Sequence, residues 1–177
     1  MHKKLVLVEH DPEWKNIYKQ EAQKIKNILG NELIEIHHIG STAIPDLIAK
    51  PIIDILVVVK NIEALDSLQD KFVSNDYEWM GEYGISDRRF ILKPNPNKNN
   101  RQLLENLAHI HCFQQGSPHI IRHIAFRDYL LKNPDIVKKY ANLKRKLLKS
   151  GVDRDQYQNQ KDAFIKAIEQ EAIRQKN

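Results

Sequence analysis

Residues 37–59 read HHIGSTAIPDLIAKPIIDILVVV, and the architecture of the chain follows from this segment. Residues 33–39 form a run rich in β-branched residues, and Gly40 follows it directly. This pattern predicts a strand that ends in a turn. The end of the quoted segment, residues 51–59, is the most apolar part of the chain, and only Asp54 interrupts it. Such a segment is typical of a strand in the middle of a sheet, covered on both faces. The sequence therefore predicts two neighbouring strands that bring a bend of small residues close to one carboxylate.

The bend and the carboxylate together have the chemistry of a phosphate site. Gly40 lets backbone N–H groups approach a phosphate, and the hydroxyls of Ser41 and Thr42 can donate to its oxygens. Asp54 can hold a Mg²⁺ ion that bridges the phosphate, because Mg²⁺ prefers oxygen ligands and takes few of them from protein. The alternatives are structural: a turn and helix cap at the bend, and a buried acid that accepts backbone hydrogen bonds.

Three segments of the chain resemble signature stretches of the GrpB family. They are residues 38–45 (HIGSTAIP), 49–55 (AKPIIDI) and 126–130 (FRDYL). The similarity extends to DPEW at residues 11–14, to His109-Ile110-His111, and to Tyr157 with Lys161. This resemblance implies an α+β fold: a nucleotidyltransferase-like mixed β-sheet with flanking helices and a C-terminal helical segment.

The resemblance also implies one domain over residues 1–177, with the sheet in about residues 1–117 and a helical extension in about residues 118–177. A chain of 177 residues is long enough for one substantial core but short for two. The GrpB family is assigned to the nucleotidyltransferase superfamily by fold, so for function the resemblance implies a nucleotide or another phosphorylated small molecule as ligand. A divalent metal, Mg²⁺ or Mn²⁺, is the implied cofactor.

One feature of the superfamily is missing from this chain. Active nucleotidyltransferases typically place two carboxylates on alternate residues of one strand, so that both face the same side and bind two metal ions. Here the alternate positions around Asp54 hold Ile52 and Leu56. Further metal ligands must then come from other segments, and two histidines two apart on a strand share a face. The candidates for this role are Glu82, His109 and His111.

Four basic residues are candidates for neutralising phosphate charge, arginine as a planar fork and lysine as a point charge. They are Lys50, Arg89, Arg127 and Lys161. Structural interpretations stand beside two of them: Arg127 can pair with Asp128 to position a helix, and Lys161 can pack against Tyr157. His119 and His123 lie four apart on a predicted helix and are interpreted as surface histidines.

The rest of the chain alternates helical and strand patterns. Asp11 and Pro12 start a helix that extends to about residue 29, and the apolar spacing of residues 62–75 predicts a second helix. Strands are predicted at residues 77–80, 88–93 and 107–113. Two prolines and four asparagines in residues 94–101 predict an exposed, mobile loop. Beyond Ser117 the pattern is helical, with breaks at residues 133–135 and at Gly151.

Composition limits the compartment and the partners. The apolar run near the N-terminus is too short for a secretory signal, no run approaches the roughly 20 residues of a membrane span, and Cys112 is the only cysteine. We therefore expect a cytoplasmic protein without membrane contact. The net charge of +5 is carried by the C-terminal third, which indicates either a solvated basic helical face or a phosphate-rich ligand such as RNA.

Two functional hypotheses follow. In the first, the protein binds a nucleotide and transfers a nucleotidyl or phosphoryl group with a divalent metal; Asp54 and Ser41 are the catalytic candidates. In the second, it is a catalytically inactive member of the fold that acts as a nucleotide-, RNA- or protein-binding regulatory module. The missing second carboxylate favours the second hypothesis, because loss of a metal ligand abolishes chemistry and spares affinity.

Overall fold

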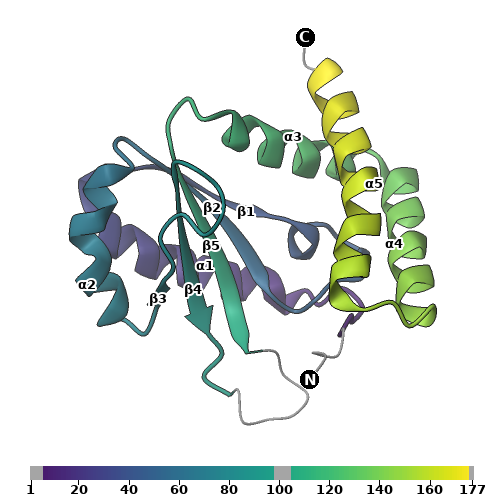
Figure 1. The fold of residues 1–177 in the computed structure, drawn as a ribbon, viewed down its shortest axis with the longest axis horizontal. Helices are drawn as coiled ribbons and strands as arrows, with labels where there is room; N and C mark the ends of the chain where they lie inside the picture. Colours follow the sequence, from purple (N-terminus) through teal and green to yellow (C-terminus); the bar gives the residue numbers. More distant parts are fainter. Residues whose placement is uncertain (1–5, 98–104, 176–177) are drawn as a thin grey trace.

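A computed structural model describes residues 6–97 and 105–175 of the chain. At its centre lies one five-stranded sheet with the order β1-β2-β5-β4-β3. The strands are β1 (Leu33–Ile39), β2 (Ile53–Val59), β3 (Glu78–Trp79), β4 (Arg88–Pro94) and β5 (Asn106–Gln114). Only β2 and β5 pair in parallel, so the sheet is mixed. Helices flank it on both sides, which confirms the expected α+β class (Figure 1).

Strand β2 lies between β1 and β5, the interior place that its apolar run predicts. The side chains of residues 55–59 are at most 2% exposed. The strand begins at Ile53 and not at residue 51. Pro51 has no N–H to give to the sheet. The N–H of Ile52 donates to the carbonyl of Lys50 in a tight turn, with an N···O distance of 2.8 Å.

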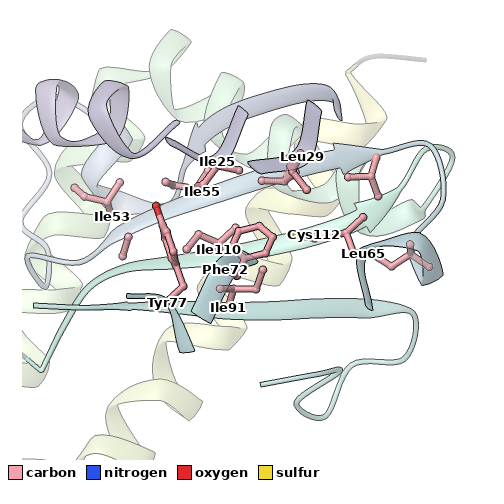
Figure 2. Close-up of a cluster of buried hydrophobic side chains, with 14 of the residues drawn as sticks. Ile25, Leu29, Ile53, Ile55, Leu65, Phe72, Tyr77, Ile91, Ile110 and Cys112 are labelled. Carbon is pink, nitrogen blue, oxygen red and sulfur yellow. The ribbon is translucent and has the colours of Figure 1, made fainter. Parts of the chain in front are cut away.

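One face of the sheet packs on α1 (Glu13–Leu29) and α2 (Gln69–Val73). Figure 2 shows this core, in which Ile25 and Leu29 of α1 lie over Ile55 of β2. Successive strand residues point to opposite faces, so burying Ile53, Ile55 and Val57 turns Asp54 to the other face. The apolar periodicity of β2 therefore decides on which side of the sheet the acid lies.

The helix predicted at residues 62–75 is confirmed in position, but more than half of it is not an α-helix. The structure has a 3₁₀ helix, η3 (Glu63–Leu68), followed by the five residues of α2. The N–H of Leu65 donates to the carbonyl of Ile62, and the Ser67 hydroxyl donates to the carbonyl of Ala64. These bonds reach back three residues, which tightens the turn into 3₁₀ geometry while keeping the apolar side chains on the core.

The other face of the sheet carries the C-terminal helices α3 (Pro118–Lys132), α4 (Pro134–Lys149) and α5 (Arg154–Arg174). Figure 1 shows α4 and α5 side by side at the edge of the sheet where β1 lies. The predicted breaks are confirmed, because α3 ends before Asn133 and α4 ends before Gly151. Ser117 caps α3 by accepting from the N–H of His119, and Asp153 caps α5 through a reciprocal pair with Gln156. Among the helices of residues 6–97 and 105–175, none is long and apolar enough to cross a membrane.

Only the start of the loop predicted at residues 94–101 lies among the described residues. Pro94 ends β4, and the N–H of Asn95 donates to the carbonyl of Glu105 at 2.8 Å, so the two sides of the connection are joined there. Residues 98–101 of the predicted loop lie outside the described part of the chain.

Truncation of a core side chain tests this packing. Ile110 is 0% exposed at the centre of the α1 face, so Ile110→Ala should lower the free energy of unfolding by about 2–5 kcal/mol in urea titrations. The matched control is Ile121→Ala on α3, where the side chain is 56% exposed and the expected change is within about 0.5 kcal/mol. Equal losses at the two sites would contradict the described core.

Candidate functional site

The site begins at the bend after β1, where Gly40 lies directly against Asp54. In the β1–β2 register Ile39 pairs with Asp54, and Gly40 has φ +70° and ψ −170°. A β-carbon at position 40 would lie 2.6 Å from Oδ2 of Asp54. Glycine is therefore required at position 40 for two reasons: other L residues rarely adopt this φ, and the Asp54 carboxylate occupies the space of a side chain.

Asp54 lies between two histidines on the same face of the sheet. Parallel pairing places Asp54 beside His109, and the next outward residue of β5 is His111. Oδ1 of Asp54 is 3.7 Å from Nδ1 of His109 and 3.6 Å from Nε2 of His111. Burial alone would raise the pKa of Asp54, but contact with His111 and the charges of His109 and Lys161 outweigh it and lower the pKa. Asp54 is therefore an anion at neutral pH, with its side chain 33% exposed.

A buried lysine completes the bend from the opposite side. Lys144 of α4 is 2% exposed, and its Nζ donates to Ser41 Oγ at 2.6 Å and to the carbonyl of Ile48 at 2.9 Å. The ammonium also lies 4.4 Å from the ring centroid of Tyr140. Burial and the charge of Lys161 hold the pKa of Lys144 well below its ordinary value. The structure thus binds α4 to the bend through a cation that is costly to bury.

Two further lysines lie around the ring of Tyr157. Nζ of Lys50 is 5.5 Å and Nζ of Lys161 is 5.4 Å from its centroid. Tyr157 is 1% exposed, so its buried ring forms a fixed part of the wall beside both lysines. Burial lowers the pKa of Lys161, while the nearby Asp54 opposes this shift. Both sequence interpretations of Tyr157 and Lys161 describe part of the arrangement, since the pair packs together and also lines a cavity.

These groups surround a cavity of about 220 Å³, here called the lysine cavity. Its polar wall includes Ser41, Lys50, Asp54, His109, Lys144 and Lys161. A larger cavity of about 440 Å³ lies between the residues 44–46 and the helices α3 and α4, and its wall is mostly apolar. We place the functional site at the smaller cavity because the perturbed ionisable groups converge there.

Three sequence candidates lie away from the lysine cavity. Arg89 is on the α1 face of the sheet, where Nε and Nη2 donate to the two oxygens of Asp66 at 2.6 and 2.8 Å. Arg127 donates to Asp128 and to the carbonyl of His38, so it fastens α3 to β1. Glu82 is exposed and closes its own turn by accepting from the N–H of Asp87. The phosphate-binding roles of both arginines and the metal role of Glu82 are not supported by these positions.

The remaining candidates lie together. Gly40, Ser41, Thr42, Lys50, Asp54, His109, His111 and Lys161 all line the lysine cavity or the cavity that adjoins it. Thr42 is 3% exposed and its hydroxyl pairs with Nε2 of His38, so its first role is to fix the bend. His123 was expected on the surface but lines the adjoining cavity, and burial lowers its pKa to about 3.

Lys144 was missed by sequence reasoning, although the sequence holds a signal for it. The buried residues of α4 are Val137, Tyr140, Ala141, Lys144 and Leu147. They follow the three- and four-residue spacing of an apolar helical face. A lysine on such a face must find partners for its ammonium, and a search for charged residues on apolar stripes would have found it.

The residues do not form a ready metal centre. Within the part of the chain that the structure describes, no group of three or more His, Cys, Asp or Glu side chains is arranged to hold a metal ion. Asp54 presents one oxygen to two imidazoles, a set that does not suit Mg²⁺, which prefers oxygen ligands. The expected Mg²⁺ or Mn²⁺ ion stays a prediction.

Comparisons with known proteins agree with the sequence motifs. Residues 4–171 match the family described as GrpB protein. The chain is 39% identical over 175 residues to UPF0157 protein YqkA of Bacillus subtilis, covering 98% of this chain and 49% of that protein. It is 33% identical to Glutamate-rich protein GrpB of Alkalihalophilus pseudofirmus, covering 93% of each. The crystal structure of conserved protein GrpB from Enterococcus faecalis superposes with a TM-score of 0.86 at 42% identity, covering 96% of this chain and 98% of that one.

A substitution at the bend tests the contact between Gly40 and Asp54. Gly40→Ala should destabilise the protein more than Gly81→Ala, because Gly81 has a similar φ of +61° with no atom near its missing β-carbon. The control should lose about 1–2 kcal/mol from backbone strain alone. Asp54→Ala should recover part of the extra loss in a double-mutant cycle followed by urea unfolding. Equal losses for both glycines, with additive double-mutant energies, would rule out the contact.

The buried ammonium of Lys144 gives stability a pH dependence. Because its pKa is lowered in the folded protein, the unfolded chain binds more protons between that pKa and the ordinary value of about 10.5. The free energy of unfolding should therefore rise with pH in this window, and Lys144→Met should flatten the rise. Urea titrations of both proteins between about pH 7 and 9 measure the difference. Parallel pH profiles would show that Lys144 is not perturbed.

Proposed function

The chain belongs to the GrpB family, and we propose that it binds a nucleotide or another phosphorylated small molecule in the lysine cavity. The observation that carries this proposal is the convergence of Lys50, Lys144 and Lys161 on one cavity whose wall holds a single carboxylate. A surplus of cations in a confined space is suited to a ligand with several negative charges.

The energetics of the site support the same conclusion. Burial lowers the pKa values of Lys144 and Lys161, and the charges of Lys161 and Lys50 lower that of Lys144 further, so protonation of both side chains in the folded protein is costly. A phosphate between them supplies the missing counter-charge and strong acceptor oxygens. Binding free energy is then gained from relief of repulsion as well as from new hydrogen bonds.

Each part of the site has a distinct role in this proposal. The bend at Gly40 brings backbone N–H groups to the ligand, and Ser41 presents its hydroxyl, held in place by Lys144. Lys50 and Lys161, both near the Tyr157 ring, neutralise phosphate oxygens. Asp54, the one carboxylate of the lysine cavity, lies beside His109 and His111 and faces the bound ligand, where it can orient a reacting group.

Transfer of a nucleotidyl or phosphoryl group is the catalytic form of this proposal, within the nucleotidyltransferase-like fold that the family resemblance implies. The rival form is a binding module without chemistry. Ile52 and Leu56 at the alternate β2 positions favour the rival, since a two-metal clamp has no second carboxylate there. RNA as a partner stays a prediction; Lys138, Lys139, Lys146 and Lys149 lie exposed on α4, as a solvated basic face would.

A thermal-shift series tests nucleotide binding. ATP, GTP, CTP, UTP and inorganic triphosphate are each added with and without Mg²⁺ or Mn²⁺ to the wild type, Lys161→Gln and Asp54→Ala. A ligand at a hundred times its Kd stabilises by about 2.7 kcal/mol, which for a chain of this size raises Tm by about 5–10 °C. Lys161→Gln should lose most of this shift.

The matched control for that series is Lys146→Gln, which removes an exposed lysine of α4 and should keep the full shift. If no triphosphate raises the Tm of the wild type at millimolar concentration, the proposed function is wrong. If Lys146→Gln and Lys161→Gln lose the shift equally, binding is to the basic surface and not to the lysine cavity.

A further inference from the structure

A second cavity adjoins the lysine cavity through a common wall. It has a volume of about 250 Å³ and is here called the acidic cavity, after Asp162 and Glu169 of α5. The two cavities share four residues: Ser41, Asp54, Gln158 and Lys161. The bend and the β2 carboxylate therefore face two compartments at once, and a single phosphate ligand accounts for only one of them.

The two compartments differ in chemistry. Apart from the shared wall, the lysine cavity has Lys50 and Lys144 and no acid. Beyond the shared wall, the acidic cavity has two carboxylates, Asp162 and Glu169, and one guanidinium, Arg122; His111, His123 and the ring of Phe126 also line it. A second phosphate group would meet both carboxylates and fewer cations than in the lysine cavity. The acidic cavity is therefore suited to an occupant with less negative charge.

Hydrogen-bonding groups of both kinds remain available in the acidic cavity. Nη1 of Arg122 and Oε1 of Glu169 are 3.6 Å apart, which is an ion pair but longer than a hydrogen bond. Asp162 accepts one bond, from the amide of Gln158 at 2.9 Å, and a carboxylate can accept several. A hydroxyl group can both donate to these carboxylates and accept from the guanidinium, so a molecule with several hydroxyls matches the wall.

We propose that the acidic cavity binds a small polyhydroxylated molecule and that this molecule receives the phosphoryl or nucleotidyl group from a nucleoside triphosphate held in the lysine cavity. The inference rests on the proposed function and extends it by naming the acceptor class. It extends the catalytic form of that function, in which a second substrate must reach the same carboxylate as the nucleotide.

The transfer is a simple displacement at phosphorus. A hydroxyl oxygen of the acceptor forms a new bond to the phosphorus atom at the common wall, and the bond from that phosphorus to its leaving phosphate oxygen breaks. The hydroxyl proton goes to the carboxylate of Asp54. The leaving group is the nucleoside diphosphate in phosphoryl transfer and pyrophosphate in nucleotidyl transfer, and its phosphates stay paired with the lysines until release. No electron carrier is required, and the two substrates supply every atom of the products.

The experiment uses ATP as the phosphate probe, with glucose, ribose, myo-inositol and glycerol as the hydroxyl probes. Saturation-transfer NMR on the full chain measures each probe alone and both classes together. At least one polyol should bind, and its signal should persist when ATP is added. The double variant Asp162→Asn/Glu169→Gln should weaken polyol binding on the order of tenfold and leave ATP binding within about twofold. Phosphorus NMR then follows formation of a new phosphate ester.

Two single variants keep the test decisive. Asp162→Asn alone replaces the double variant if the loss of Glu169 unfolds the protein, and Lys50→Gln should weaken ATP while leaving polyol binding in place. ATP binding without any polyol signal, displacement of the polyol by ATP, or polyol binding that is unchanged in Asp162→Asn each overturns the acceptor proposal and spares the nucleotide proposal. Absence of ATP binding overturns the proposed function itself.

Discussion

The approach of Asp54 to the backbone of Gly40 is the constraint on which the site depends. The carboxylate occupies the volume that any side chain at position 40 would fill, so the bend and the acid form one unit. The alternation of β2 then determines the side on which this unit lies, since burial of Ile53 and Ile55 against α1 leaves Asp54 on the face of the C-terminal helices. Core packing and site geometry are consequently two results of a single strand register.

The C-terminal helices complete the site at an energetic cost. Lys144 reaches Ser41 from α4, and Lys161 reaches the common wall from α5, so cations on two helices meet an acid on the sheet. Protonation of three lysines around a cavity with a single carboxylate in its wall is unfavourable, and such perturbed groups are characteristic of functional sites. The energy that stabilises the helices comes from elsewhere, from an apolar cluster that includes Phe126, Leu130 and Tyr140.

The sequence predicted the parts of the site that are local and missed the parts that depend on tertiary register. Gly40, Ser41 and Asp54 were found because bend, strand and acid are close in the chain. The face of the sheet on which Arg89 lies depends on the β4–β5 register, which pairs Arg89 with Cys112 and not with His111. The sequence does not show this register, so it did not place Arg89 away from the site. Lys144 comes within 2.6 Å of Ser41 across 103 residues, and only the packing of α4 brings the two together.

Calorimetric titration of the protein with inorganic triphosphate, in buffers of different ionisation enthalpy at about pH 8.5, tests the central claim most directly. An anion among the lysines raises their lowered pKa values, so binding should take up protons, and the observed heat should change with the buffer. Lys144→Met should reduce this uptake. Absence of binding, or binding whose heat is the same in every buffer and unchanged in Lys144→Met, would contradict an anion site built on buried lysines.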